Sequence, residues 1–166
     1  DGHEAEISEY LIKKLPAARV VMDGGSLRAS NIKLAAWTDY FVVSEHFARD
    51  YMSYRSLSTE AEIKAALIEL NKICRGEAFI TLGEKGCAFL KSGMLQIVPS
   101  WLCNAVDTTG AGDTYTGYFI AEYLKKQDPV RALSIASMAA SIAVSREGAA
   151  SAIPEREEVL QRLQQV

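Results

Sequence analysis

A glycine-rich turn followed at once by an aspartate is the feature of this sequence best suited to chemistry. Gly110-Ala111-Gly112 and Asp113 precede a long apolar pattern typical of a helix, so the turn lies where the first backbone N–H groups of that helix lack partners. Such a terminus favours negative charge, and glycines let a large anion approach the backbone closely. A carboxylate beside a bound phosphate repels it, so its presence there suggests a chemical role. The role that fits is to accept the proton of a hydroxyl group that attacks phosphorus.

A purely structural interpretation of the same residues is also open. A Gly-Ala-Gly turn can simply connect a strand to a helix, and an aspartate in a first turn is ordinary complementation of the helix dipole. Two other phosphate-binding motifs are excluded. No Gly-Lys-Ser/Thr follows the turn, and Tyr115 stands where the GxGxxG pattern needs its third glycine.

The segments around this turn predict an α/β fold with a doubly wound, mainly parallel sheet and helices on both faces. Strands are expected at 19–22, 40–43, 78–82, 87–91 and 94–98, and the last two are joined at Ser92-Gly93. Helices are expected at 5–15, 32–37, 45–51, 59–73, 114–126 and 129–145, and from 155 on. The stretch 98–106 is expected to approach the turn in extended form. In such a sheet, ligands bind beyond the carboxyl ends of the strands.

Bulk composition narrows the class of protein. The 166 residues amount to a single domain, 1–166, and the 49% hydrophobic and 23% charged residues are ordinary for a globular protein. A net charge of -3 argues against nucleic acid as a partner, and the longest apolar run, 133–144, is too short to cross a membrane. Three widely spaced cysteines predict reduced, mostly buried thiols and a cytoplasmic location. The polar opening, 1–4, is unlike a signal peptide and suggests the middle of a larger protein.

The stretch 107–119, DTTGAGDTYTGYF, resembles the C-terminal signature of the ribokinase-like (PfkB) carbohydrate kinases. The D-T-x-G-A-G-D pattern is matched from Asp107 to Asp113. One departure is Tyr118, where the family usually has a second small residue after Gly117. The resemblance extends to T-L-G-E-K-G at 81–86, to the glycine of S-R-E-G-A and to I-P-x-R-E-E at 153–158. It therefore covers nearly all of the chain, whereas the N-terminal half and the lid of the family have no counterpart.

The resemblance implies ATP-dependent phosphorylation of a sugar hydroxyl. Asp113 would be the general base, and the backbone of Gly110, Ala111 and Gly112 would hold the transferred phosphoryl group. The ATP site that the resemblance implies includes Thr81, Gly83, Gly86, Ser137 and Gly148. Mg²⁺ would bridge the phosphates. Ser44 and Phe47 stand where many members have the Asn and Glu that help to hold it. Glu45 could reach the metal by another route, but the sequence favours an acid that only complements the helix dipole. Asp107 and Thr109 match positions that hold K⁺ in ribokinases, and Ala152 replaces a serine found there.

The partners implied are ATP and a small-molecule sugar, with this chain as the C-terminal nucleotide-binding portion of the kinase. Without the other half, we expect little kinase activity and an exposed sheet edge that favours association, for example into a homodimer. Two alternatives stay open: a kinase of the same fold for a nucleoside or vitamin-like alcohol, and a non-catalytic nucleotide-binding or regulatory module. Retention of Asp113 argues against the second alternative, because a binding site gains nothing from a carboxylate beside phosphate.

Overall fold

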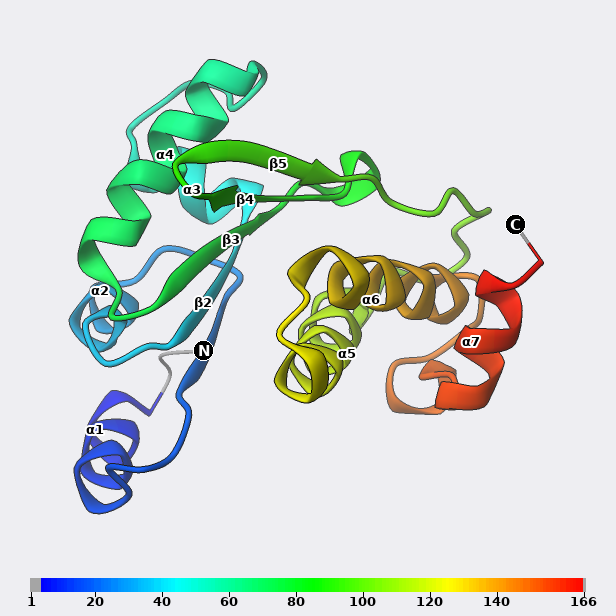
Figure 1. Ribbon diagram of the computed structural model, residues 1–166, viewed down its shortest axis with the longest axis horizontal. Helices are drawn as coiled ribbons and strands as arrows, with labels where there is room; N and C mark the ends of the chain where they lie inside the picture. The colour runs from blue at the N-terminus through cyan, green and yellow to red at the C-terminus, as the bar shows by residue number, and fades with distance from the viewer. Residues whose placement is uncertain (1–3, 166) are drawn as a thin grey trace. The chain divides into compact units, whose positions relative to one another are not determined.

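The computed structural model describes residues 4–165 and has the predicted α/β fold (Figure 1). Along the chain its elements are α1 (Ala5–Lys14), β1 (Val21–Gly24), α2 (Ala29–Ala35), β2 (Tyr40–Ser44), α3 (Glu45–Tyr51), α4 (Glu60–Ile73), β3 (Glu77–Thr81), β4 (Cys87–Lys91), β5 (Met94–Val98), α5 (Ala111–Lys126), α6 (Pro129–Val144) and α7 (Arg156–Leu163). Short 3₁₀ turns occur at Gly83–Lys85 and Ala150–Ala152.

The sheet has the order β1-β2-β3-β4-β5, and β1, β2 and β3 are parallel. Strands β4 and β5 are joined by Ser92 and Gly93 alone, and both of these residues have positive φ, as a tight hairpin turn requires. A two-residue connection makes this pair antiparallel, so the sheet is mixed. The strands follow one another across the sheet in chain order. The reversal of strand order that defines a doubly wound sheet therefore does not occur among these five strands. Strand β1 has one strand neighbour in the described sheet, and the expectation that another part of a longer protein covers an exposed edge stays a prediction.

The core of the sheet follows the two-residue periodicity of its strands. Phe41 and Val43 of β2, together with Ile80 of β3, pack on one face against buried residues of α2, α3 and α4. Val42 and Phe79 point to the opposite face and are also buried, which is typical of parallel strands. Continuous apolar runs in these strands therefore reflect burial on both faces.

Helix starts were predicted well where a side chain caps the helix. Thr59 and Glu62 form a capping box at the start of α4, and the Ser44 hydroxyl accepts the amide of Phe47 at the start of α3. The predicted start of α5 at Thr114 was wrong. The helix begins three residues earlier because Gly110, with φ 75°, is its N-cap. The stretch before it, 99–110, contains no strand, so the extended approach is not part of the sheet.

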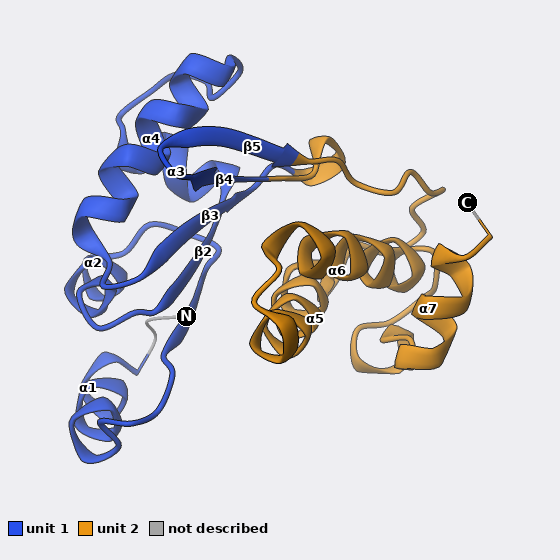
Figure 2. Ribbon diagram, viewed as in Figure 1, with its two compact units in different colours: residues 1–82, 88–97 blue, residues 83–87, 98–166 orange. Residues whose placement is uncertain are grey.

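The described chain packs as two compact units (Figure 2). The first comprises the described residues up to Leu82 together with Ala88–Ile97, and the second comprises Gly83–Cys87 and the described residues from Val98 on. In the second unit α5 and α6 lie side by side, and α6 packs against Val159 of α7 through Ile135, Met138 and Ile142. The expectation of a single domain stays a prediction. No helix within residues 4–165 is long and apolar enough to cross a membrane.

The three cysteines are free thiols, as expected. Cys74 and Cys87 are buried, and burial raises the pKa of the Cys87 thiol to about 12. Cys103 is exposed, so the expectation of burial holds for two of the three.

Gly86 is expected to be among the most sensitive positions for stability. It has φ 103°, and an added Cβ would lie 1.9 Å from the carbonyl oxygen of Val98. Gly83 also has positive φ, at 59°, but an added Cβ there meets nothing within 4 Å. Gly86→Ala should therefore lower the free energy of unfolding by about 2–5 kcal/mol, whereas Gly83→Ala should cost about 1–2 kcal/mol. Urea denaturation of the two variants measures this difference, and equal losses would contradict the packing argument.

Candidate active site

The turn at Gly110 has the geometry of an open anion site. Gly110 adopts the left-handed conformation and caps α5, so Ala111, Gly112 and Asp113 form the first turn of the helix. A Cβ added at Gly112 would meet nothing within 4 Å, so a ligand can reach the backbone there. The helix N-terminus adds a favourable field for negative charge.

The amide groups of this turn are not equally available. The Ala111 N–H donates to the Thr108 carbonyl at 3.2 Å, and the Thr114 N–H donates to the Gly110 carbonyl at 2.9 Å. Gly110, Gly112 and Asp113 have amides without an acceptor among residues 4–165. The sequence predicted donors at Gly110, Ala111 and Gly112. The structure differs at Ala111, because its amide closes the turn and is occupied.

Asp113 occupies the third position of α5, and its side chain is exposed. Within residues 4–165 its carboxylate makes no hydrogen bond and no ion pair. The carboxylate is therefore free to take a proton from a bound hydroxyl group. Its role as a general base for phosphoryl transfer stays a prediction.

Asp107 holds the loop that precedes the turn. Its carboxylate accepts the amide of Thr109 at 2.9 Å and the amide of Gly148, 41 residues away, at 3.0 Å. The Thr109 amide, then the Thr109 hydroxyl and the Gly148 amide, lower the pKa of this carboxyl below its usual range. Asp107 thus joins the turn to the C-terminal segment. Its role with Thr109 as a K⁺ site stays a prediction, and the described residues hold no cluster of three His, Cys, Asp or Glu side chains arranged for a metal.

Ser137 joins α6 to the segment that contains Trp101, and its role in ATP binding stays a prediction. Its buried hydroxyl accepts the amide of Trp101 at 3.0 Å, and the Trp101 indole donates to the Ser134 carbonyl at 3.2 Å. Next to this contact lies a hollow of about 820 Å³ between the 101–106 segment, α6 and α7. Met138 and Ile142 line it with Arg146, which is paired with Glu158. The sequence did not predict this hollow, because its walls come from three separate segments.

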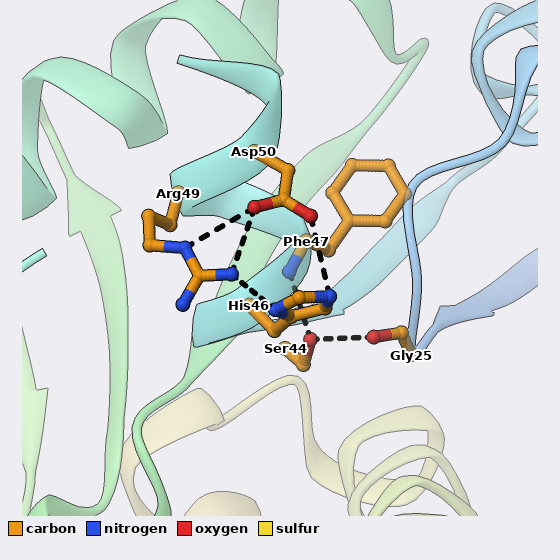
Figure 3. Close-up of polar contacts among 6 residues, drawn as sticks. All are labelled: Gly25, Ser44, His46, Phe47, Arg49 and Asp50. Atoms are coloured by element: carbon orange, nitrogen blue, oxygen red, sulfur yellow. Dashed lines mark hydrogen bonds and ion pairs between the residues drawn. The ribbon is translucent and has the colours of Figure 1, made fainter. Parts of the chain in front are cut away.

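The remaining predicted residues lie elsewhere in the chain. Thr81 donates its hydroxyl to the Val43 carbonyl at 3.3 Å, and Glu45 is the first residue of α3. The next residue, His46, places its Nε2 3.2 Å from a carboxylate oxygen of Asp50 on the surface of α3 (Figure 3). The structure brings together Asp107, Thr109, Gly148 and the 110–113 turn in the second unit. Thr81 and Glu45 belong to the first unit, and their roles stay predictions, as do those of Gly83 and Gly86.

A second feature of α5 was missed by sequence reasoning. The side chain of Glu122 is only 7% exposed. Its carboxylate accepts hydrogen bonds from Nε and Nη2 of Arg156, at 2.6 and 3.0 Å, and from Nζ of Lys125 at 2.8 Å. A groove of about 400 Å³ runs from Asp113 along α5 to Arg156. The signal available in the sequence was Arg156 within the I-P-x-R-E-E match, but nothing local pointed to Glu122.

This ion pair predicts a loss of stability in acid. The Arg156 hydrogen bonds, opposed by burial and aided by Lys125, lower the pKa of Glu122 from 4.5 to about 2. The stabilisation is therefore present above pH 4.5 and is lost as the pH falls toward 2. Glu122→Gln should cost about 1–3 kcal/mol of unfolding free energy at pH 7, and this cost should shrink toward pH 2.5. Urea denaturation across this range, with the exposed Glu155→Gln as control, measures the change. A cost that is the same at both pH values would contradict the assignment.

Comparison with known proteins gives the family. The model of the "pfkB family carbohydrate kinase" matches residues 27–156, which include the 107–113 loop, Asp113, Gly148 and Arg156. The chain belongs to the PfkB family of carbohydrate kinases. This PfkB chain is 31% identical over 158 residues to a ribokinase of Staphylococcus aureus, and the match covers 95% of the chain and 52% of that ribokinase. A ribokinase of Haemophilus influenzae is 29% identical over 159 residues, covering 96% of the chain and 51% of the relative.

Solved structures agree with the PfkB assignment. An Arabidopsis thaliana ribokinase complexed with ribose and ATP superimposes with a TM-score of 0.83 at 25% identity, covering 96% of this chain and 51% of that one. The Thermotoga maritima ribokinase gives a TM-score of 0.79 at 26% identity, covering 95% and 52%. The predicted resemblance is confirmed. The chain spans about half the length of the relatives it matches.

Proposed function

We propose that this chain is the nucleotide-binding part of an ATP-dependent kinase that phosphorylates a sugar hydroxyl. The observation that carries the proposal is the exposed, unpaired carboxylate of Asp113 in the first turn of α5, beside the free amide of Gly112. An anion site alone has no use for that carboxylate. The family supports the same chemistry, since the named relatives are ribokinases.

The residues of the turn fit a phosphate group. The amides of Gly110, Gly112 and Asp113 lack acceptors within the described chain, and the space above Gly112 is open. These donors would hold the transferred phosphoryl group and stabilise the charge that spreads over its oxygens in the transition state. ATP supplies the phosphoryl group, and Mg²⁺ neutralises the charge of its phosphates.

Asp113 would take the proton of the attacking hydroxyl. Its position on a helix fixes the carboxylate relative to the amides of the turn, and orientation of this kind is a large part of phosphoryl-transfer catalysis. The acceptor is proposed to be a sugar, and ribose is the first to test because the Arabidopsis ribokinase was solved with ribose and ATP. Since the chain spans half of its relatives, we expect the isolated chain to have little turnover.

A chimera tests the proposed function. This chain would replace the matching part of the Staphylococcus aureus ribokinase, to which it is 31% identical over 158 residues. ATP-dependent phosphorylation of ribose and other sugars would be measured by mass spectrometry, with the intact ribokinase and the isolated chain as controls. We expect the chimera to phosphorylate a sugar and the isolated chain to do so far more slowly. A folded chimera that binds Mg-ATP and ribose without transferring phosphate would contradict the proposal.

A further inference from the structure

The segment Gly148 to Arg156, here called the C-terminal strap, contacts α5 at points from its N-cap, Gly110, to Glu122. At one end the Gly148 amide binds Asp107 at 3.0 Å. The next residue, Ala149, has its Cβ 3.4 Å from the position that a Cβ on Gly110 would take. The strap therefore contacts the N-cap of the helix that carries Asp113, and any displacement of the strap changes the space at that turn.

The other end of the strap is fixed to α5 by two side chains. The Tyr118 hydroxyl donates to the Pro154 carbonyl at 2.5 Å. Four residues further along the same face, Glu122 receives the Arg156 fork. Tyr118 is the residue at which this chain departs from the small-residue pattern of the family. Its hydroxyl reaches Pro154 of the strap, a contact that a small residue at this position could not make.

The Glu122–Arg156 pair differs from the exposed ion pairs of this chain. Both oxygens of the carboxylate are engaged, and the carboxylate is 7% exposed, whereas Lys72 and Glu69 of α4 are 63% and 42% exposed. A two-point Arg–carboxylate contact at a buried acceptor fixes geometry as well as charge. The contact therefore defines where the strap lies along α5.

We propose that Tyr118 and Arg156 are positioning residues for the phosphate-binding turn, acting through the C-terminal strap. They hold Pro154 and the residues before it so that Gly148 reaches Asp107 and Ala149 lies against Gly110. Neither side chain need touch nucleotide. The effect on nucleotide binding rests on the proposed function, whereas the positioning of Gly148 does not.

Hydrogen exchange of the Gly148 amide tests the positioning directly. The variants are Tyr118→Phe, which removes one hydroxyl, Arg156→Met, which removes the fork, and Arg156→Lys, which keeps the charge. Lys72→Met, which breaks the exposed pair with Glu69, is the control. We expect Gly148 exchange to rise roughly 3- to 30-fold in Tyr118→Phe and Arg156→Met, less in Arg156→Lys, and not at all in the control. Amides in the buried middle of α6, such as that of Ala139, should exchange as in the unchanged chain.

Titration calorimetry with Mg-ATP gives the second measurement. We expect the Kd of Tyr118→Phe and Arg156→Met to rise roughly 3- to 30-fold, in step with Gly148 exchange. Unchanged Gly148 exchange, or a rise shared equally by the α6 amides, would overturn the proposal. Normal Mg-ATP binding despite faster Gly148 exchange would overturn it as well. If the unchanged chain itself binds no Mg-ATP, the isolated chain gives the proposed function no support, and hydrogen exchange alone decides whether the strap is positioned as we propose.

Discussion

Replacing Asp113 by asparagine is expected to lower the turnover of a kinase assembled around this chain by roughly 10²- to 10⁴-fold. Asparagine has nearly the same shape but cannot accept the hydroxyl proton. Because the side chain is exposed and makes no hydrogen bond or ion pair within residues 4–165, the substitution removes no structural contact. The loss should therefore appear in kcat, with Mg-ATP affinity nearly unchanged. The chimera with the Staphylococcus aureus ribokinase is the protein in which to measure it.

Glu155→Gln is the matched control for this experiment. Glu155 is another exposed carboxylate, and it lines the same groove as Asp113. Its replacement removes an equal charge from the groove without touching the turn, so turnover should stay within about twofold of that of the unchanged chimera, the size of effect expected for an exposed charge. Equal turnover in Asp113→Asn and the unchanged chimera would rule out Asp113 as the general base. Equal losses in Asp113→Asn and Glu155→Gln would point to overall charge as the cause.

Gly112→Asp is expected to remove most of the affinity for Mg-ATP. The added Cβ enters open space, and an aspartate in the first turn suits the helix dipole, so the fold should tolerate the change. The new carboxylate would lie where phosphate is proposed to bind. At about 4 Å, its repulsion of one phosphate charge is about 1 kcal/mol in water and about 4 kcal/mol near a protein surface. This range corresponds to a rise in Kd of roughly 5- to 1000-fold.

Gly117→Asp provides a control on the same helix. Gly117 is also exposed, and an added Cβ there meets nothing within 4 Å. The two variants therefore add the same charge to α5 at equal steric cost, but only one adds it to the first turn. Titration calorimetry should show strong loss in Gly112→Asp and a small change in Gly117→Asp. Similar Kd values for the two variants would place the phosphates away from the turn.

The local elements of this fold were largely predictable from sequence. Thr59 with Glu62, Ser44 and the Ser92-Gly93 turn each act on neighbours within four residues, so the pattern of residue types was enough to place α4, α3 and the β4–β5 hairpin. The start of α5 was misplaced by three residues, because a glycine can cap a helix by its backbone conformation without any side-chain signal.

In the candidate site too, residues close together in the chain could be predicted, whereas contacts between distant residues could not. Gly110, Gly112 and Asp113 are close neighbours in the chain, so their chemistry follows from residue type and spacing alone. The Asp107–Gly148 contact spans 41 residues, the Ser137–Trp101 contact spans 36 and the Glu122–Arg156 contact spans 34. Contacts of this range depend on how α5, α6 and the C-terminal strap pack, and no local pattern encodes them.

By itself, the sequence determined the α/β class and the glycine turn with its carboxylate at the start of a helix, because these depend on residue type and short spacing. Only the tertiary structure decided which amides of the turn are free, why Gly86 must be a glycine and what Tyr118 and Glu122 hold. Each of these is a matter of distance between atoms far apart in the chain, such as the 1.9 Å that would separate a Cβ on Gly86 from the Val98 carbonyl. Such distances depend on how the elements pack, and the packing depends on the whole fold rather than on any short stretch of sequence.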